Sequence, residues 1–182
     1  MTSRLGPWLV GLAVAAAGLF AIWTSPATPP PLGRGSDAPD LRLPALDGTP
    51  VSLRELRGRV VLINFWATWC KPCEEEMPAM ERLYGELRPD GFELLAISAD
   101  DAEADVSGFA ARLGLSFPVL RDVDKAVARE YQTFRFPESF LVDREGVVVE
   151  RYIGPKDWDA PSYVDRVRRL LAETAGTSGP NR

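Results

Sequence analysis

Two cysteines, Cys70 and Cys73, are the residues of this sequence whose type and spacing point most directly to chemistry. A thiol attacks a disulfide as the thiolate, and a second thiol three residues later is close enough to resolve the mixed disulfide that forms on the first. The pair can therefore cycle between a dithiol and a disulfide. The alternative is a static structural bridge, but so small a loop restricts the unfolded chain little and stabilises the fold little.

The residues around the pair favour a reactive thiolate. The apolar run VVLINFWA over 60–67 predicts a buried strand, and apolar residues after Cys70 recur at spacings of three and four, which predicts a helix. Cys70 is then at the N-terminus of that helix, where unpaired backbone N–H groups stabilise negative charge. Lys71 adds a positive charge, and Pro72 fits a first helical turn because no hydrogen bond is lost there.

Composition excludes several other kinds of chemistry. The 182 residues include no histidine, which excludes Ser-His-Asp and Cys-His catalysis and histidine-ligated zinc or copper. Two cysteines are too few for a four-cysteine zinc or iron–sulfur site. Lys and Arg number 21 against 26 Asp and Glu, so no strongly basic surface is expected for nucleic acid. We expect no nucleic-acid partner and no cofactor beyond a redox-active disulfide between Cys70 and Cys73.

The N-terminal segment is predicted to anchor the chain in a membrane. Residues 5–23 carry no charge, and at about 1.5 Å per residue they extend roughly 28 Å, close to the thickness of a hydrocarbon core. Arg4 precedes the run, and Trp8 and Trp23 stand near its ends, which is typical of an anchor whose N-terminus is cytoplasmic. A cleaved signal peptide is the alternative, although no small-x-small site follows the run. We expect a signal anchor or transmembrane helix over 1–23, with the rest on the periplasmic or extracytoplasmic side of the cell membrane.

One globular domain is predicted beyond this anchor. Four prolines in TSPATPPPLGRG predict an extended linker over 24–36, a domain follows over 37–174, and residues 175–182 are expected to form a flexible tail. Strand patterns alternate with helical ones and end in a hairpin, which predicts an α/β fold with a mixed sheet covered by helices on both faces. The expected strands are 60–67, 92–99, 117–120, 139–143 and 147–153, with a hairpin over 41–53, and helices capped by Asp101 and Asp124 and a last helix at 163–171.

The sequence around the cysteines resembles a known family. The run INFWATWCKPC, the carboxylate of Glu76, Met77-Pro78 and the later FPESFLVD are similar to the membrane-anchored thioredoxin-like thiol-disulfide oxidoreductases of the TlpA/ResA/CcmG (DsbE) family. The resemblance covers roughly residues 37–173. It implies a thioredoxin fold with an N-terminal β-hairpin and a central αβ insertion over 100–120, preceded by one N-terminal transmembrane helix.

The resemblance also implies roles for individual residues. Pro137 is expected to follow a cis peptide bond beside the cysteines, although it can also simply begin an edge strand. Glu76 is expected to handle the proton of the resolving thiol, because Asn64 occupies the place of the buried aspartate of ordinary thioredoxins; acids in a first helical turn also simply favour the helix dipole. The expected catalytic residues are Cys70, Cys73, Glu76 and Pro137, and the expected substrate-binding residues are Trp69, Lys71, Pro72 and Phe136.

An acidic cluster has a plainer interpretation. Asp100, Asp101, Glu103 and Asp105 resemble a metal site only in composition, and we interpret them as the capped, solvated start of a helix.

The expected function is that of an extracytoplasmic thiol-disulfide oxidoreductase that reduces disulfides of client proteins. The resemblance implies clients such as apocytochrome c or copper-site proteins, and a membrane electron donor of the CcdA/DsbD type. Glu138 after Pro137 is typical of the cytochrome-maturation branch, whereas WCKPCEEEMP is more like TlpA or ResA, so the client stays open. Three alternatives remain: a peroxiredoxin-like peroxidase, which typically lacks the second cysteine of this pair; a copper-delivery module, which uses CxxxC and a histidine; and a non-catalytic adaptor.

Overall fold

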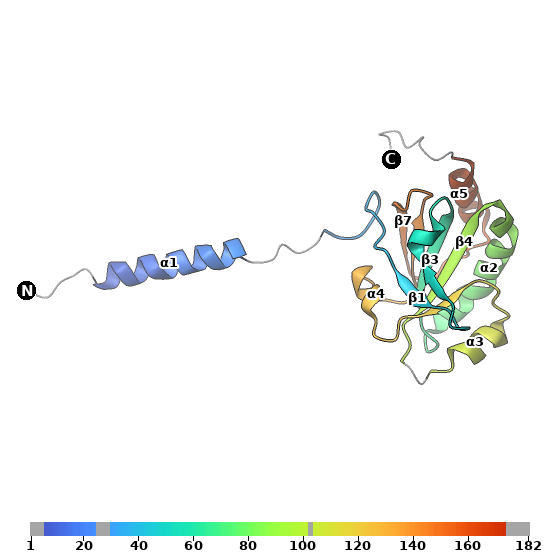
Figure 1. Cartoon of the computed structure of the whole chain (residues 1–182), viewed down its shortest axis with the longest axis horizontal. Coiled ribbons are helices and arrows are strands. Elements are labelled where there is room, and N and C mark those ends of the chain that lie inside the picture. Colours follow the sequence, from blue (N-terminus) through green and yellow to red (C-terminus); the bar gives the residue numbers. More distant parts are fainter. Residues whose placement is uncertain (1–5, 25–29, 102–103, 174–182) are drawn as a thin grey trace, which may run out of the picture. The chain divides into compact units, whose positions relative to one another are not determined.

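The computed structural model describes residues 6–24, 30–101 and 104–173. The chain forms two units, Met1–Pro31 and Leu32–Arg182, and the first contains helix α1 (Gly6–Thr24) (Figure 1). In the part of the chain that is described, no helix is long and apolar enough to cross a membrane. The anchor predicted over 1–23 stays a prediction, and the tail predicted over 175–182 lies outside the described residues.

The second unit is built on a five-stranded mixed sheet with the order β5-β4-β3-β6-β7. The central strand β3 is parallel to β4 and antiparallel to β6. A hairpin of two short strands precedes this sheet, as the sequence predicts. The strands are β1 (Arg42–Pro44), β2 (Pro50–Ser52), β3 (Val60–Trp66), β4 (Phe92–Ser98), β5 (Val119–Arg121), β6 (Glu138–Val142) and β7 (Val148–Ile153).

Helices cover both faces of the sheet (Figure 1). The helices α2 (Lys71–Leu87), α3 (Val106–Leu113) and α5 (Pro161–Ala172) share a core with Leu62 and Trp66 of β3. Helix α4 (Ala126–Glu130) packs on the opposite face. Two short 3-10 helices, η1 (Leu53–Leu56) and η2 (Arg88–Asp90), lie in the connections that precede β3 and β4. This is the predicted thioredoxin-like α/β architecture, with α3 and β5 in the region of the predicted central insertion.

Strand β3 is buried along its whole length because it lies between two cores. Successive side chains of a strand point to opposite faces, so Leu62 and Trp66 belong to one core and Ile63 and Phe65 to the other. A strand buried on both faces shows no polar alternation, which explains the continuous apolar run in the sequence.

The cap of α3 differs from the prediction, whereas the cap predicted for α4 is present and is joined by a second acid. Helix α3 begins at Val106, so its cap is Asp105, whose side chain accepts the backbone N–H of Gly108 at 2.8 Å, and not Asp101. A side chain caps a helix only from the position before its first turn. At α4, buried Asp122 accepts N–H groups of the helix at 3.2 and 2.8 Å, and Asp124 accepts one at 3.2 Å.

The domain begins at Leu32, earlier than the predicted boundary at Asp37. Leu32 is buried, and its backbone N–H donates to the side chain of Gln132 at 3.0 Å. Backbone hydrogen bonds then join Gly35 and Ser36 to Val148 at the start of β7. The last part of the predicted linker over 24–36 therefore packs as part of the domain, and residues 25–29 lie outside the described ranges.

Candidate active site

The two cysteines form a disulfide where β3 gives way to α2. Cys70 is the N-cap of α2, and its sulfur is 2.06 Å from that of Cys73, with the two Cα atoms 5.3 Å apart. Cys70 retains 5% exposure and Cys73 retains none, so Cys70 is the thiol that a partner can approach. The N-cap position leaves Cys70 beside the N–H groups of the first turn, which stabilise a thiolate once the disulfide is reduced.

A second segment, far along the chain, meets the cysteine loop through aromatic rings. The ring centroids of Trp69 and Phe136 are 5.9 Å apart, and the bond between Phe136 and Pro137 is cis, as the resemblance implies. Trp69 is 72% exposed and Phe134, in the same segment as Pro137, is 80% exposed. Two of the predicted substrate-binding residues therefore lie together beside Cys70, on an apolar surface open to solvent.

Lys71 and Pro72 are exposed at the start of α2. The Lys71 Nζ atom lies 3.7 Å from Glu74 and 4.0 Å from Glu75, and Arg112 also binds Glu74 at 2.8 Å. The hydrogen bond from Arg112 is the main cause that lowers the pKa of Glu74. Lys71 therefore shares its charge with two acids of its own helix, and in water such pairs contribute little to stability.

Glu76 lies behind the disulfide, one helical turn after Cys73, and is 4% exposed. Its Oε1 accepts a hydrogen bond from Asn64 Nδ2 at 2.9 Å. Its Oε2 accepts the backbone N–H of Lys156 and the indole N–H of Trp158, each at 3.0 Å. These three donors come from β3 and from the segment between β7 and α5, so the carboxylate joins three parts of the domain.

Burial raises the pKa of Glu76 above the ordinary glutamate value. The N–H groups of Lys156, Trp158 and Asn64 oppose this effect, because all three bond the ionised form. A buried carboxyl group with a raised pKa takes up and releases a proton closer to neutral pH than a solvated one does. Its place one turn from Cys73 suits it to exchange a proton with that thiol.

Asp100 departs from the predicted solvated helix start. It is 3% exposed, and its carboxylate accepts the backbone N–H of Thr68 at 2.9 and 3.1 Å and the Thr68 hydroxyl at 2.7 Å. Ser98 donates to the same carboxylate at 2.8 Å. Asp100 thus fixes the loop just before Cys70 from the end of β4. No repeating sequence pattern marks this contact, because a single buried aspartate cannot be told from the exposed acids next to it in the sequence.

The model of the AhpC/TSA family matches residues 34–151. The chain belongs to the AhpC/TSA family. Within it, the thiol-disulfide oxidoreductase ResA of Bacillus anthracis is 42% identical over 120 residues, which are 66% of this chain and 69% of that protein. ResA of Geobacillus thermodenitrificans is 43% identical over 114 residues, 63% of this chain and 66% of that protein.

Solved structures share the fold of this domain. A putative thiol:disulfide interchange protein DsbE from Chlorobium tepidum has a TM-score of 0.72 and 32% identity, and the match covers 77% of this chain and 99% of that one. Peroxidoxin BcpB from Mycobacterium tuberculosis has a TM-score of 0.67 at 22% identity over 76% of this chain and 98% of that one, a likeness that shows the fold alone. The kinship with ResA and DsbE is confirmed, and with the Cys70–Cys73 pair it identifies this AhpC/TSA member as a thiol-disulfide oxidoreductase.

Proposed function

We propose that this protein is a reductase that transfers electrons from the Cys70–Cys73 dithiol to disulfides of client proteins outside the cytoplasm. The observation that carries the proposal is the position of Cys70, at the N-terminus of α2 and next to the exposed ring of Trp69, which contacts the partly buried ring of Phe136. A thiolate at a helix N-terminus is stabilised, and an apolar surface next to it offers a place for the chain around a client's disulfide.

The first step is attack on the client. The Cys70 thiolate attacks one sulfur of the client disulfide, that disulfide breaks, and the other client sulfur leaves as a thiolate that takes a proton from solvent. The product is a mixed disulfide between Cys70 and the client. Asp100 and Thr68 hold the loop that carries Cys70, so the attacking sulfur keeps its place while the client docks.

The second step releases the client. Cys73 transfers its proton to the Glu76 carboxylate, and its thiolate attacks the Cys70 sulfur. The mixed disulfide breaks, the Cys70–Cys73 disulfide forms, and the second client thiolate departs and is protonated. The client thereby gains two electrons from the enzyme and two protons, the first from solvent and the second from solvent or from the protonated Glu76. Loss of that proton restores the Glu76 carboxylate, and a dithiol donor of the CcdA/DsbD type would return the two electrons to the Cys70–Cys73 disulfide.

The location and the clients are part of the same proposal. The uncharged run over 5–23 supports attachment to the cell membrane, with the domain on the periplasmic or extracytoplasmic side. The pairing of Glu138 with Pro137 supports the cytochrome-maturation branch, whereas the sequence around Cys70 is more like TlpA or ResA, so the proposed clients include both apocytochrome c and copper-site proteins. Membrane fractionation of the host, with and without residues 1–23, tests the attachment.

Two cysteine variants test the reaction. In an assay that follows reduction of a protein disulfide with dithiothreitol as donor, Cys70→Ser should abolish turnover because the attacking sulfur is gone. Cys73→Ser, reduced beforehand and mixed with the client in the absence of dithiothreitol, should not release reduced client. It should instead accumulate a mixed disulfide with the client, visible by non-reducing electrophoresis and removed by added thiol. Turnover by Cys70→Ser, or equal trapping by the two variants, would contradict the proposal.

The direction of the reaction is tested by the reduction potential of the cysteine pair. We expect a value at or below the glutathione poise of about −220 to −260 mV, because Lys71-Pro72 lacks the histidine of strong oxidants. A value near about −120 mV would instead make the protein an oxidant. Turnover with hydrogen peroxide in Cys73→Ser as fast as in the wild type would favour the peroxidase alternative.

A further inference from the structure

A polar pair, Asn64 and Ser139, joins two neighbouring strands in the middle of the sheet. Asn64 has no exposed surface, and it lies on the face of β3 that Leu62 and Trp66 share, the face covered by α2. Ser139 of β6 is its direct partner in the antiparallel register. Buried polar groups are retained in a core only where their hydrogen bonds are made, so the contacts of Asn64 indicate what it does there.

Both N–H groups of the Asn64 side-chain amide donate hydrogen bonds, and they can do so in only one orientation of the amide. Nδ2 donates to Glu76 Oε1 and to Ser139 Oγ, each at 2.9 Å. Asn64 Oδ1 is buried and accepts no hydrogen bond from any residue in the described part of the chain. Rotating the amide by half a turn would bring Oδ1 against the Glu76 carboxylate, oxygen to oxygen. The site therefore leaves a buried acceptor unpaired and keeps an N–H group directed at Glu76, an arrangement that has a free-energy cost.

We propose that Asn64 is a positioning residue that keeps the Glu76 carboxylate ionised and fixed in place, ready to take the proton of Cys73. The inference rests on the proposed function only for the identity of that proton donor. Asn64 itself forms and breaks no covalent bond. It acts through Glu76, because an N–H group that bonds a carboxylate stabilises the ionised form more than the protonated one.

The effect of Asn64 on the ionisation of Glu76 can be measured apart from the effects of the other groups around that carboxylate. Burial opposes ionisation, and the backbone N–H of Lys156 and the indole of Trp158 favour it together with Asn64. The charge of Lys156 also favours the carboxylate, while its Nζ atom is held by the backbone oxygens of Ile153 and Gly154. Of the side chains that bond Glu76, only Asn64 can lose its N–H by a nearly isosteric substitution.

The test follows the ionisation of Glu76 directly. The side-chain carboxyl carbon of Glu76 is titrated by ¹³C NMR in the full chain in detergent, with ¹³C-labelled glutamate and assignment by Glu76→Gln. In Asn64→Ala the midpoint should move upward by about one to two pH units, the effect of one hydrogen bond to a charged group. In Asn64→Asp, which preserves the shape, the two carboxyl groups should titrate in two steps, with the upper one above the wild-type midpoint.

Ser139→Ala is the matched control, because it removes the other partner of Asn64 and leaves the contact with Glu76 intact. Its midpoint should stay within about 0.3 pH units of the wild type, less than the change expected for one lost bond to a charged group. Equal shifts in Ser139→Ala and Asn64→Ala, or no shift in either Asn64 variant, would overturn the proposal. These outcomes are independent of the proposed function, which fails instead if Cys70→Ser keeps its turnover.

Discussion

The buried carboxylate of Glu76 places a titratable group near the disulfide in a sequence that contains no histidine. Histidine is the usual residue for proton transfer near neutral pH, and the sequence has none. Burial gives Glu76 a raised pKa, while three N–H donors limit the rise and fix the position of both oxygens. At the residue scale, the active site combines one partly accessible sulfur with one enclosed acid.

The raised pKa of Glu76 predicts how stability changes with pH. The folded-state pKa lies above that of the unfolded chain, so the protonated carboxyl group favours the folded state. Its stabilising contribution is complete below the unfolded value of about 4.3 and is lost as the pH rises through the folded value. Urea unfolding of wild type and Glu76→Gln should therefore show a free-energy difference that shifts in favour of Gln as pH rises, by at most about 1.4 kcal/mol per pH unit.

The exposed neighbour Glu75 provides the control for this measurement. Its side chain is 63% exposed, so Glu75→Gln should change the free energy of unfolding by a small amount without the same slope. The altered hydrogen bonds in Glu76→Gln add an offset that is the same at each pH, and only the slope reports ionisation. A difference between wild type and Glu76→Gln that stays constant from pH 4 to 9 would contradict the raised pKa.

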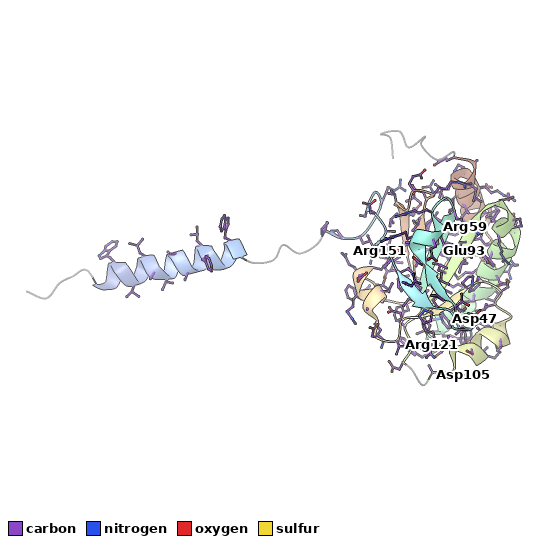
Figure 2. The ribbon with its side chains drawn as sticks, viewed as in Figure 1. Asp47, Arg59, Glu93, Asp105, Arg121 and Arg151 are labelled. Carbon is purple, nitrogen blue, oxygen red and sulfur yellow. A yellow bond between two sulfur atoms is a disulfide. The ribbon has the colours of Figure 1, made fainter. Side chains whose placement is uncertain are left out.

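At the scale of elements, Arg151 of β7, which is labelled in Figure 2, joins the cis-proline segment to its surroundings. Arg151 Nε lies 2.6 Å from the carboxylate of Glu138, the residue after Pro137. The same guanidinium donates to the backbone oxygens of Gln132 at 2.8 Å and Leu32 at 3.0 Å. Glu138, which the sequence shows only as a marker of one family branch, is thus the buried member of an ion pair whose arginine side chain is 22% exposed. The pair links β6, β7 and the segment before β6.

Loss of Arg151 should therefore destabilise the domain strongly. Arg151→Met retains much of the side chain's length but leaves Glu138, which is 3% exposed, without its cation, and breaking one side of a buried pair costs about 3–5 kcal/mol. Chemical unfolding measures this loss, and hydrogen exchange should show the fastest new opening around residues 132–138. Arg168→Met, which removes an exposed pair with Glu86, should cost at most about 1 kcal/mol. Equal losses in the two variants would show that the buried pair carries no special weight.

The sequence predicts those elements whose burial leaves a repeating pattern. Strands β3 and β4 are buried on both faces and appear as apolar runs, and α2 shows a helical spacing, so their places are close to the prediction. The predicted cap of α3 is wrong because the capping residue depends on where the backbone enters the helix. Several acids near that point are able to cap it. The partners of Glu76 at Lys156 and Trp158 are 80 and 82 residues away, and no local pattern marks a backbone N–H as a donor.

At the scale of the whole molecule, the start of the domain is decided by packing and not by composition. Proline content predicts a linker up to residue 36, yet the structure shows Leu32 at 8% exposure, bonded to Gln132 and Arg151. Residues 32–38 thus pack against the start of β7 and reach the arginine that supports the cis-proline segment. Hydrogen bonds through Arg151 therefore link the beginning of the domain to the segment that precedes Pro137.

Two shortened chains test this connection. A chain that begins at Leu32 should unfold at nearly the same urea concentration as the full protein, because the compact unit that contains the sheet begins there. A chain that begins at Asp37 loses a buried leucine and its hydrogen bonds to Gln132 and Arg151, which together contribute about 3 kcal/mol. It should also reduce clients more slowly, since Arg151 then loses one of the contacts that hold the segment before Pro137. Equal midpoints for the two shortened chains would show that residues 32–36 are a linker after all, and the boundary would return to Asp37.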